Sequence, residues 1–255
     1  MELSHQELFD FLEAKYEQYN RSEFIKTDPV SVPHRFTRKE DIEIAAFLTA
    51  TISWGNRISI VKDADKLLSM MEFSPYEFIL QSDRSENKRF ESFYHRTFNG
   101  KDCIFFIESL KNIYQQHGGL ESLFIPDDES GIKGVLCRFK TAFLEIDHPR
   151  RSEKHIADPC KGASAKRLLM FLRWMTRNDQ RGVDFGLWNK ISPSVLMCPL
   201  DIHSGNVARK LGLLKRKQND WNAVEELTEN LRQFDPADPV KYDFALFGLG
   251  VFERF

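Results

Sequence analysis

The sequence predicts an all-α protein, because apolar residues recur at helical spacing and strand-like alternation is almost absent. Of the 255 residues, 42% are hydrophobic and 29% are charged, which is ordinary for a globular chain that buries one core or two lobes. The 22 Phe against 6 Tyr indicate a core of flat rings packed between helices. We therefore expect a two-lobed helical fold.

The N-terminal half is predicted to be a series of helices joined by polar turns. The first helix carries an apolar stripe formed by Leu8, Phe9, Leu12 and Tyr16. Residues 22–39 contain two prolines and no clear period, so they are expected to form a connecting segment between helices. Residues 41–54 are apolar almost all round, which predicts a centrally buried helix. Residues 82–100 are charged and are expected to form a loop or a short helix. Further helices are expected over residues 58–71, after Ser74, over 101–119 and over 131–147.

The C-terminal half begins with an amphipathic helix at residues 163–177, followed by a turn-rich stretch with two prolines, and ends in helices that restart near Ile202. Three regions follow from this pattern. The N-terminal helix and connector should pack on the C-terminal lobe, next to a central lobe with a hairpin-like segment at 159–177. The predicted bounds are 1–39, 40–190 and 191–255.

Several kinds of protein are excluded by composition. No apolar run is long enough to span a bilayer, and the N-terminus lacks the features of a signal peptide. The cysteines show no close pairing, which argues for reduced thiols and against a zinc or iron–sulfur site. We expect a cytoplasmic protein, without a membrane partner, metal or cofactor. The four cysteines are Cys103, Cys137, Cys160 and Cys198.

The formal net charge of −2 gives no overall attraction to nucleic acid, so any affinity must come from local asymmetry. Basic residues outnumber acidic ones over 160–181 and again over 209–217, whereas acidic residues gather over 121–129 and 220–238. Such runs are usually solvated helix faces. Two basic runs on either side of one candidate site favour a DNA-facing surface instead.

Two segments carry the candidate chemistry. The first is PCKGASAKRLLM at residues 159–170, and the second is PLDIHSGNVARKLGL at residues 199–213. The second resembles the stretch in endonuclease III and the 8-oxoguanine glycosylases where a catalytic Asp opens a helix. The first resembles the hairpin of that helix-hairpin-helix superfamily. The resemblance implies that superfamily's two-lobed fold, with Lys166 as the catalytic lysine and Asp201 as the catalytic aspartate.

Weaker similarity to the same superfamily covers most of the chain, and the whole sequence is also similar to an uncharacterised bacterial family known only as a domain of unknown function. The glycosylase pattern is not complete. Ser164 replaces the second hairpin glycine, which weakens a backbone-amide site for phosphate. Lys166 and Asp201 are 35 residues apart, which is longer than in endonuclease III. No C-terminal cysteine cluster exists to hold an iron–sulfur centre.

The implied chemistry suits these residue types. A carboxylate stabilises the oxocarbenium character that develops when an N-glycosidic bond breaks. A neutral lysine attacks the sugar carbon and forms a Schiff base, which permits β-elimination and strand cleavage. Positive charge on Arg167 and Lys161 would favour the neutral amine. The target base must leave the stack to enter a pocket, for which three tryptophans are candidates: Trp54, Trp174 and Trp188.

We thus predict a DNA glycosylase with abasic-site lyase activity, working as a monomer on damaged duplex DNA, with an oxidised purine as one candidate lesion. The residues expected to contact DNA are Lys161, Gly162, Ser164, Arg167, Asn56, His203 and Arg209. A non-catalytic nucleic-acid-binding relic of the same fold is the alternative, and an enzyme on another small substrate is a third.

Each assignment also has a purely structural interpretation. Asp201 could be only a helix N-cap, and Lys166 an ordinary solvated lysine. His203 and the tryptophans could serve packing alone. Asp184 and Asp243 are given no role beyond a structural charge.

Overall fold

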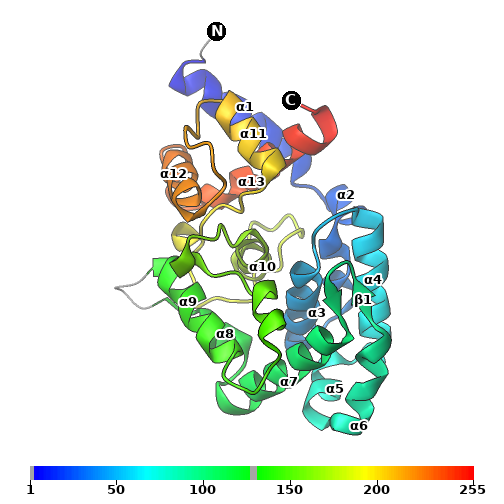
Figure 1. Cartoon of the computed structure of the whole chain (residues 1–255). Coiled ribbons are helices and arrows are strands. Elements are labelled where there is room, and N and C mark those ends of the chain that lie inside the picture. The colour runs from blue at the N-terminus through cyan, green and yellow to red at the C-terminus, as the bar shows by residue number, and fades with distance from the viewer. Residues whose placement is uncertain (1–2, 127–130) are drawn as a thin grey trace. The chain divides into compact units, whose positions relative to one another are not determined.

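The computed structural model describes residues 3–126 and 131–255, and it is predominantly helical (Figure 1). The expected all-α class is confirmed, with one two-stranded hairpin as the only sheet in the described residues. The chain forms two compact units. We call Ile25–Ala157 the central unit. The terminal unit combines the chain up to Phe24 with Asp158–Phe255.

The central unit contains helices of very different length around a phenylalanine core. The α-helices after α2 (Ser22–Ile25) are α3 (Lys39–Thr51), α4 (Arg57–Ser69), α5 (Pro75–Gln81), α6 (Arg84–Asn87), α7 (Gly100–Gln116), α8 (Leu120–Phe124) and α9 (Gly131–Phe143). Short 3₁₀ turns and the hairpin complete it: η1 (Pro29–Ser31), η2 (Pro33–Arg35), η3 (Lys88–Ser92), β1 (Tyr94–His95), β2 (Phe98–Asn99) and η4 (Arg150–His155).

The long helices of the central unit agree with the sequence pattern. Nearly every residue of α3 from Ile42 onward is buried, as its uniform apolarity predicted. Asn99 caps α7 in a capping box with Asp102, which fixes where that helix begins. The stretch at residues 82–100 differs in part from the expectation, because it holds the β-hairpin besides α6 and η3. Two-residue strands leave too short an alternation to detect in the sequence.

The terminal unit brings the two ends of the described chain together. Its helices are α1 (His5–Tyr19), α10 (Lys166–Thr176), α11 (Ile202–Lys210), α12 (Trp221–Arg232) and α13 (Asp243–Gly248). Its short turns are η5 (Pro159–Lys161), η6 (Pro193–Val195), η7 (Pro239–Tyr242) and η8 (Leu249–Glu253). Helix α13 packs against both α1 and α11 (Figure 1). A Cβ at Gly248 would stand 2.1 Å from the Tyr19 ring, so the close approach of α1 to α13 needs this glycine.

The unit boundary falls earlier than the expected start of the C-terminal lobe. The hairpin-like segment and α10 belong to the terminal unit rather than to the central one. The cause lies in the stretch after α10, which folds back on that helix. The amides of Phe185 and Trp188 donate to the carbonyls of Trp174 and Met175 at 2.7 and 3.0 Å. Lys166 and Asp201 therefore lie in one unit.

Candidate functional site

Lys166 and Asp201 each stand where a helix begins. Lys166 is the first residue of α10, and Asp201 is the N-cap of α11. The Lys166 Nζ lies 3.4 Å from Asp201 Oδ2, with 27% and 24% of the two side chains exposed. The two residues that the sequence singled out thus form a partly exposed ion pair within the terminal unit.

The two carboxylate oxygens of Asp201 have different partners. Oδ1 accepts hydrogen bonds from the amides of His203 and Ser204 at 2.8 and 3.0 Å. The Ser204 hydroxyl accepts in return from the Asp201 amide at 2.9 Å, which completes a capping box. Oδ2 faces Lys166. The N-cap interpretation of Asp201 and its pairing with Lys166 are therefore compatible, because they use different oxygens.

The surroundings of Asp201 keep its carboxyl group ionised. Burial raises its pKa, but the Lys166 ammonium and the Ser204 amide lower it by more. The net result is a pKa below the ordinary value for aspartate. At neutral pH this side chain is a carboxylate with one oxygen fixed by the backbone and the other directed at a lysine.

The hairpin-like turn before α10 uses its backbone amides internally. The amides of Lys161 and Ala163 donate to the Asp158 carbonyl at 3.1 Å each, and that of Gly162 donates to the Pro159 carbonyl at 2.9 Å. Gly162 has a φ of +87°, a conformation that favours glycine. Its carbonyl accepts from the Trp221 amide at 3.0 Å, which ties the turn to α12. These three amides are committed to the turn and are not directed at a phosphate.

Side chains of the same segment differ in exposure. The Lys161 side chain is 84% exposed, with its amine 3.9 Å from Asp158 Oδ2. Ser164 and Arg167 are half-buried. Burial lowers the pKa of Arg167 to about 10. Their contacts with DNA remain predictions.

Helix α11 exposes His203 in its first turn, whereas Arg209 in its last turn has hydrogen-bond partners. The Arg209 Nε donates to the Arg216 carbonyl at 2.8 Å, and a second nitrogen donates to Asn219 Oδ1 at 2.6 Å. Asn219 in turn donates to the Asp201 carbonyl at 3.0 Å. Arg209 thus supports the backbone that carries Asp201. A pocket of about 400 Å³ opens beside His203 and is lined by His203, Asn206, Gly250, Val251, Arg254 and Phe255.

Two of the three candidate base-stacking rings are core residues. Trp174 and Trp188 are fully buried. Trp188 packs edge-on against Phe171, with ring centroids 5.2 Å apart. Neither indole has exposed surface, so in this structure both rings pack in the core and no face is open to a flipped base.

The remaining predicted residues lie in the central unit. Asn56 caps α4, with its side-chain oxygen accepting from the Ile58 and Ser59 amides at 2.9 and 3.3 Å. Trp54 is half-buried and its ring lies edge-on to His95 at 5.0 Å. The contact of Asn56 with DNA and the stacking role of Trp54 remain predictions.

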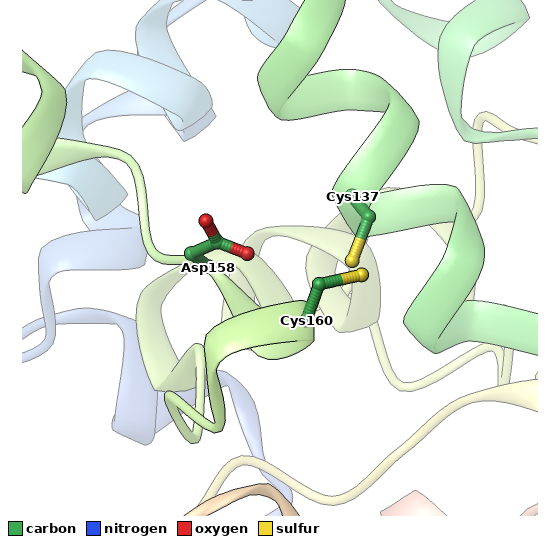
Figure 2. A group of neighbouring side chains, drawn as sticks. All are labelled: Cys137, Asp158 and Cys160. Carbon is green, nitrogen blue, oxygen red and sulfur yellow. The ribbon is translucent and has the colours of Figure 1, made fainter.

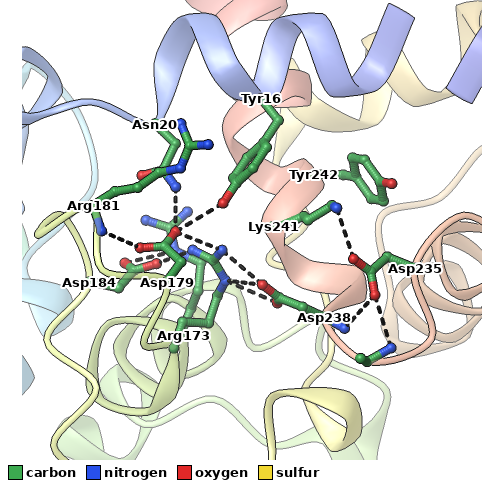
Figure 3. Close-up of polar contacts among 12 residues, drawn as sticks. Tyr16, Asn20, Arg173, Asp179, Arg181, Asp184, Asp235, Asp238, Lys241 and Tyr242 are labelled. Carbon is green, nitrogen blue, oxygen red and sulfur yellow. Dashed lines mark hydrogen bonds and ion pairs between the residues drawn. The ribbon is translucent and has the colours of Figure 1, made fainter. Parts of the chain in front are cut away.

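A buried network of charges beside the ion pair was not anticipated from the sequence (Figure 3). Arg177 is completely buried and pairs with Asp179 at 3.0 Å, with Asp238 at 2.8 Å and with Asp184. Arg173, also buried, lies 3.3 Å from Asp184. Buried arginines need such partners, because an uncompensated charge is costly away from water.

The network has further members on α1 and η7, which Figure 3 also shows. Tyr16 donates to Asp179 at 3.1 Å, and Asn20 reaches the same carboxylate. Lys241 pairs with Asp235 at 2.8 Å. The segments that build the terminal unit are therefore tied together by hydrogen-bonded charges as well as by apolar contacts.

Asp243 is the member of this network whose carboxyl group is influenced by the charges of the candidate site. It is the first residue of α13, is 7% exposed and pairs with Arg173. The charges of Lys166 and Asp201 both act on its carboxyl group. A sequence signal for this arrangement existed, since Arg173 and Arg177 interrupt the apolar face of α10 at the spacing of one turn.

Figure 2 shows three neighbouring side chains of types that can bind a metal: Cys137, Asp158 and Cys160. Cys137 lies on α9 of the central unit, whereas Asp158 and Cys160 lie at η5 of the terminal unit. Neither unit contains all three, and we build no metal centre from them. The other two cysteines, Cys103 and Cys198, are buried free thiols.

Comparison with known proteins identifies the family. A family model described as a protein of unknown function (DUF2400) matches residues 28–252, and the chain belongs to this family. No curated protein and no solved structure matches the chain. Among the described residues, no helix has both the length and the apolarity needed to cross a membrane.

Proposed function

We propose that this protein is a DNA glycosylase with abasic-site lyase activity and a fold of the helix-hairpin-helix glycosylase type. Lys166 is its nucleophile, and Asp201 stabilises the positive charge that develops on the sugar. The observation that carries the proposal is the 3.4 Å contact between Lys166 Nζ and Asp201 Oδ2. An amine and a carboxylate this close can act on the same sugar carbon.

The two side chains suit different parts of that reaction. The lowered pKa of Asp201 keeps a negative charge available to oppose an oxocarbenium-like transition state. The amine of Lys166 would form a bond to C1′ of the sugar as the bond to the base breaks, and the base would leave with one amine proton. The C1′–O4′ bond would then break as the remaining amine proton is transferred to O4′, which gives the Schiff base that precedes β-elimination. A quarter of each side chain is exposed, which leaves an approach for the sugar.

The proposal further assigns damaged duplex DNA as the partner, bound by a monomer in the cytoplasm. The target base must be extruded from the helix to reach the pair. In a chain whose net charge is −2, local positive charge comes from the exposed lysines of the two basic runs, because Arg173 and Arg177 are buried in ion pairs. These exposed lysines are Lys161, Lys210, Lys215 and Lys217. An oxidised purine is the first lesion to test.

The decisive experiment is borohydride trapping on a panel of duplexes that each carry one lesion. We expect wild-type protein to form a covalent complex with at least one lesion and Lys166→Ala to form none. Lys190→Ala is the matched control, because Lys190 is an exposed lysine of the same unit. Trapping that persists in Lys166→Ala would show that the lysine assignment is wrong.

Asp201→Asn separates the two roles of Asp201. The amide oxygen of Asn still caps α11, so stability should change by less than about 0.5 kcal/mol. Loss of the carboxylate charge should slow base release by about 10²- to 10³-fold. A variant that folds normally and retains full glycosylase activity would remove Asp201 from the mechanism.

A non-catalytic nucleic-acid-binding protein is the second candidate, and two observations favour it. The amides of the hairpin-like turn are used internally, and two of the candidate stacking rings are buried. This candidate predicts salt-dependent DNA binding without cleavage or trapping on any lesion.

A further inference from the structure

We propose that the pocket between α11 and η8 binds a phosphate group of the DNA strand that passes the Lys166–Asp201 pair. This pocket has a volume of about 400 Å³, and all of its lining residues belong to the terminal unit. The inference rests on the proposed function only in taking DNA as the partner, because the side chains of the pocket by themselves point to an anion.

Two segments of the terminal unit form the pocket. Helix α11 contributes His203 and Asn206, and the other lining residues come from η8 and the two positions after it. A Cβ on Gly250 would stand 3.1 Å from the Cβ of His203, so the close approach of η8 to α11 favours glycine at this position. The backbone after η8 is also fixed, because the Phe255 amide donates to the Leu249 carbonyl at 3.1 Å.

One wall of the pocket is an aromatic ring with a lysine beside it. The centroid of the Phe255 ring lies 6.1 Å from that of the Phe11 ring on α1. The Lys210 amine lies 5.5 Å from the centroid of the Phe255 ring, and Lys210 is exposed. Packing of the ring thus accompanies a positive charge at the edge of the pocket.

The polar side chains that line the pocket are not used by the fold. In the part of the chain that the structure describes, the side chains of His203, Asn206 and Arg254 form no hydrogen bond or ion pair. Arg209 is a contrasting case, because it donates to Asn219 at 2.6 Å and so supports the fold. Three polar side chains at one pocket therefore remain available to a ligand.

The chemistry of these side chains suits a phosphate. The lining side chains include no carboxylate, and Glu253, the acidic residue next to Arg254, pairs instead with Lys15 of α1 at 2.6 Å. The planar guanidinium of Arg254 presents a fork of N–H donors that matches phosphate oxygens, and the Asn206 amide adds further donors. Phosphate oxygens receive most of the hydrogen bonds that proteins make to DNA, so the DNA backbone supplies the matching anion.

The pocket lies directly beside the candidate site. The His203 amide donates to Asp201 Oδ1 at 2.8 Å, and the same residue lines the pocket. Asn206 follows Asp201 by five residues, which is about 8 Å along the axis of α11. One DNA strand carries a phosphate for about every 3.4 Å of duplex length, so a sugar at Asp201 has neighbouring phosphates at a comparable distance. A phosphate bound in the pocket would fix the register of the strand at the Lys166–Asp201 pair.

The test is the affinity of the full chain for a short duplex with one tetrahydrofuran abasic analogue, measured by fluorescence anisotropy. Single phosphates near the analogue are replaced in turn by uncharged methylphosphonates. The analogue has no aldehyde, so binding is measured without a Schiff base on Lys166. We expect one of the neighbouring methylphosphonates to weaken binding by wild-type protein about five- to tenfold. Arg254→Gln should lose about as much on the unmodified duplex and nothing further from that methylphosphonate.

Asn206→Asp and Asn222→Asp form a matched pair of variants. Both exchange an exposed amide for a carboxylate on a helix of the terminal unit, but Asn222 lies on α12 and does not line the pocket. The new charge at position 206 should repel the phosphate and weaken binding about tenfold. Asn222→Asp should stay within about twofold of wild type. Equal losses in the two variants would show that only the net charge of the protein matters, and would overturn the proposal.

The methylphosphonate scan decides the question even if a variant fails to fold. The proposal is wrong if wild-type protein binds no duplex, or if no single methylphosphonate changes its affinity. Equal sensitivity of wild type and Arg254→Gln at every position would also overturn it.

Two further outcomes separate the ligand and the proposed function. Inorganic phosphate that binds wild type but not Arg254→Gln, without any methylphosphonate effect, would assign the pocket to a free anion and overturn the assignment to DNA. If the effect at Arg254 is found but no lesion is trapped, the glycosylase proposal fails and the phosphate pocket stands. If trapping succeeds without that effect, the reverse holds.

Discussion

The two units of this protein are stabilised by different kinds of interior. The central unit buries a cluster of phenylalanines, in which Phe106 lies 4.8 Å from Phe143 and 5.1 Å from Phe98 between ring centroids. The terminal unit buries Arg173 and Arg177 with their carboxylates. Apolar rings pack without needing exact partners, whereas buried charges are tolerated only when each partner is in place. The candidate site lies in the terminal unit, whose interior is stable only when each buried charge has its partner.

The central unit is not free of buried charge, but its main example, Asp102, has its partners on two segments only. Asp102 is completely buried, accepts hydrogen bonds from the Ser152 hydroxyl at 2.7 Å and the Asn99 amide at 2.9 Å, and contacts Arg151 and His155. These residues join the start of α7 to η4. In the terminal unit the network instead spans α1, α10, the following segment and η7. The comparison indicates that charge ties the terminal unit together over long sequence distances.

The largest expected effect that would test this comparison comes from Arg177→Met. Removing the guanidinium leaves the carboxylates of Asp179, Asp184 and Asp238 without their shared partner. We expect a loss of about 3–5 kcal/mol in the free energy of unfolding. Hydrogen exchange resolved by peptide should place the loss in the terminal unit.

Arg181→Met is the control for that experiment. Arg181 joins the same network through Glu17 and the face of Tyr16, but its side chain is 31% exposed. Its loss should cost less than about 1 kcal/mol. Equal effects of the two substitutions would mean that burial of Arg177 gives it no special role.

A smaller effect is expected from Phe106→Leu in the central unit. The substitution removes ring contacts with several phenylalanines but strands no charge. We expect a loss of about 1–2 kcal/mol, measured by urea unfolding together with peptide-resolved hydrogen exchange. Phe73→Leu, at a position 48% exposed, should change stability by less than about 0.5 kcal/mol. If Phe106→Leu lowered the free energy of unfolding by more than Arg177→Met does, the comparison between the two units would be reversed.

The smallest expected effect is an opposite response of the two units to acid. Asp243 has a pKa raised to about 6 in the folded state from 3.8, so the folded protein binds the extra proton and is stabilised as the pH falls from 7 to 5, by about 1 kcal/mol. The pKa of Asp102 is lowered, because its hydrogen bonds and His155 outweigh burial. The contribution of Asp102 to the stability of the folded protein is therefore present above about pH 4 and is lost as the pH falls further.

Hydrogen exchange corrected for the intrinsic effect of pH measures both responses. Peptides of α13 should gain protection between pH 7 and 5, and peptides of α7 should lose it below pH 4. In Asp243→Asn the first gain should vanish while the second loss remains. The same gain in α13 of that variant would assign the response to another group.

Local sequence rules predicted much of this structure. The N-cap interpretation of Asp201 is confirmed at the start of α11, whereas the caps of α4 and α7 at Asn56 and Asn99 were not predicted. The uniform apolarity of α3 correctly predicted its burial. The sequence also brought Lys166 and Asp201 forward as a pair, although they are 35 residues apart. That step depended on resemblance, because no periodicity links residues across a turn-rich segment.

Other features followed from packing that local rules do not describe. The segment after α10 folds back on that helix, and Trp174 and Trp188 are fully buried. Only the fold could decide between a role of these rings in base stacking and a role in core packing. The short β-hairpin gave no detectable alternation. Arg173 and Arg177 stood out as charges on an apolar helix face, but their carboxylate partners come from other segments.

The sequence by itself determined the helical class and the main helices, because periodicity depends on neighbouring residues. It also singled out Lys166 and Asp201, but only through resemblance. Only the tertiary structure decided that Asp201 divides its oxygens between a helix cap and Lys166. It alone also paired Arg173 of α10 with Asp243 of α13. Ion pairs between distant segments depend on how helices pack, and that packing results from the whole chain rather than from any one stretch of it.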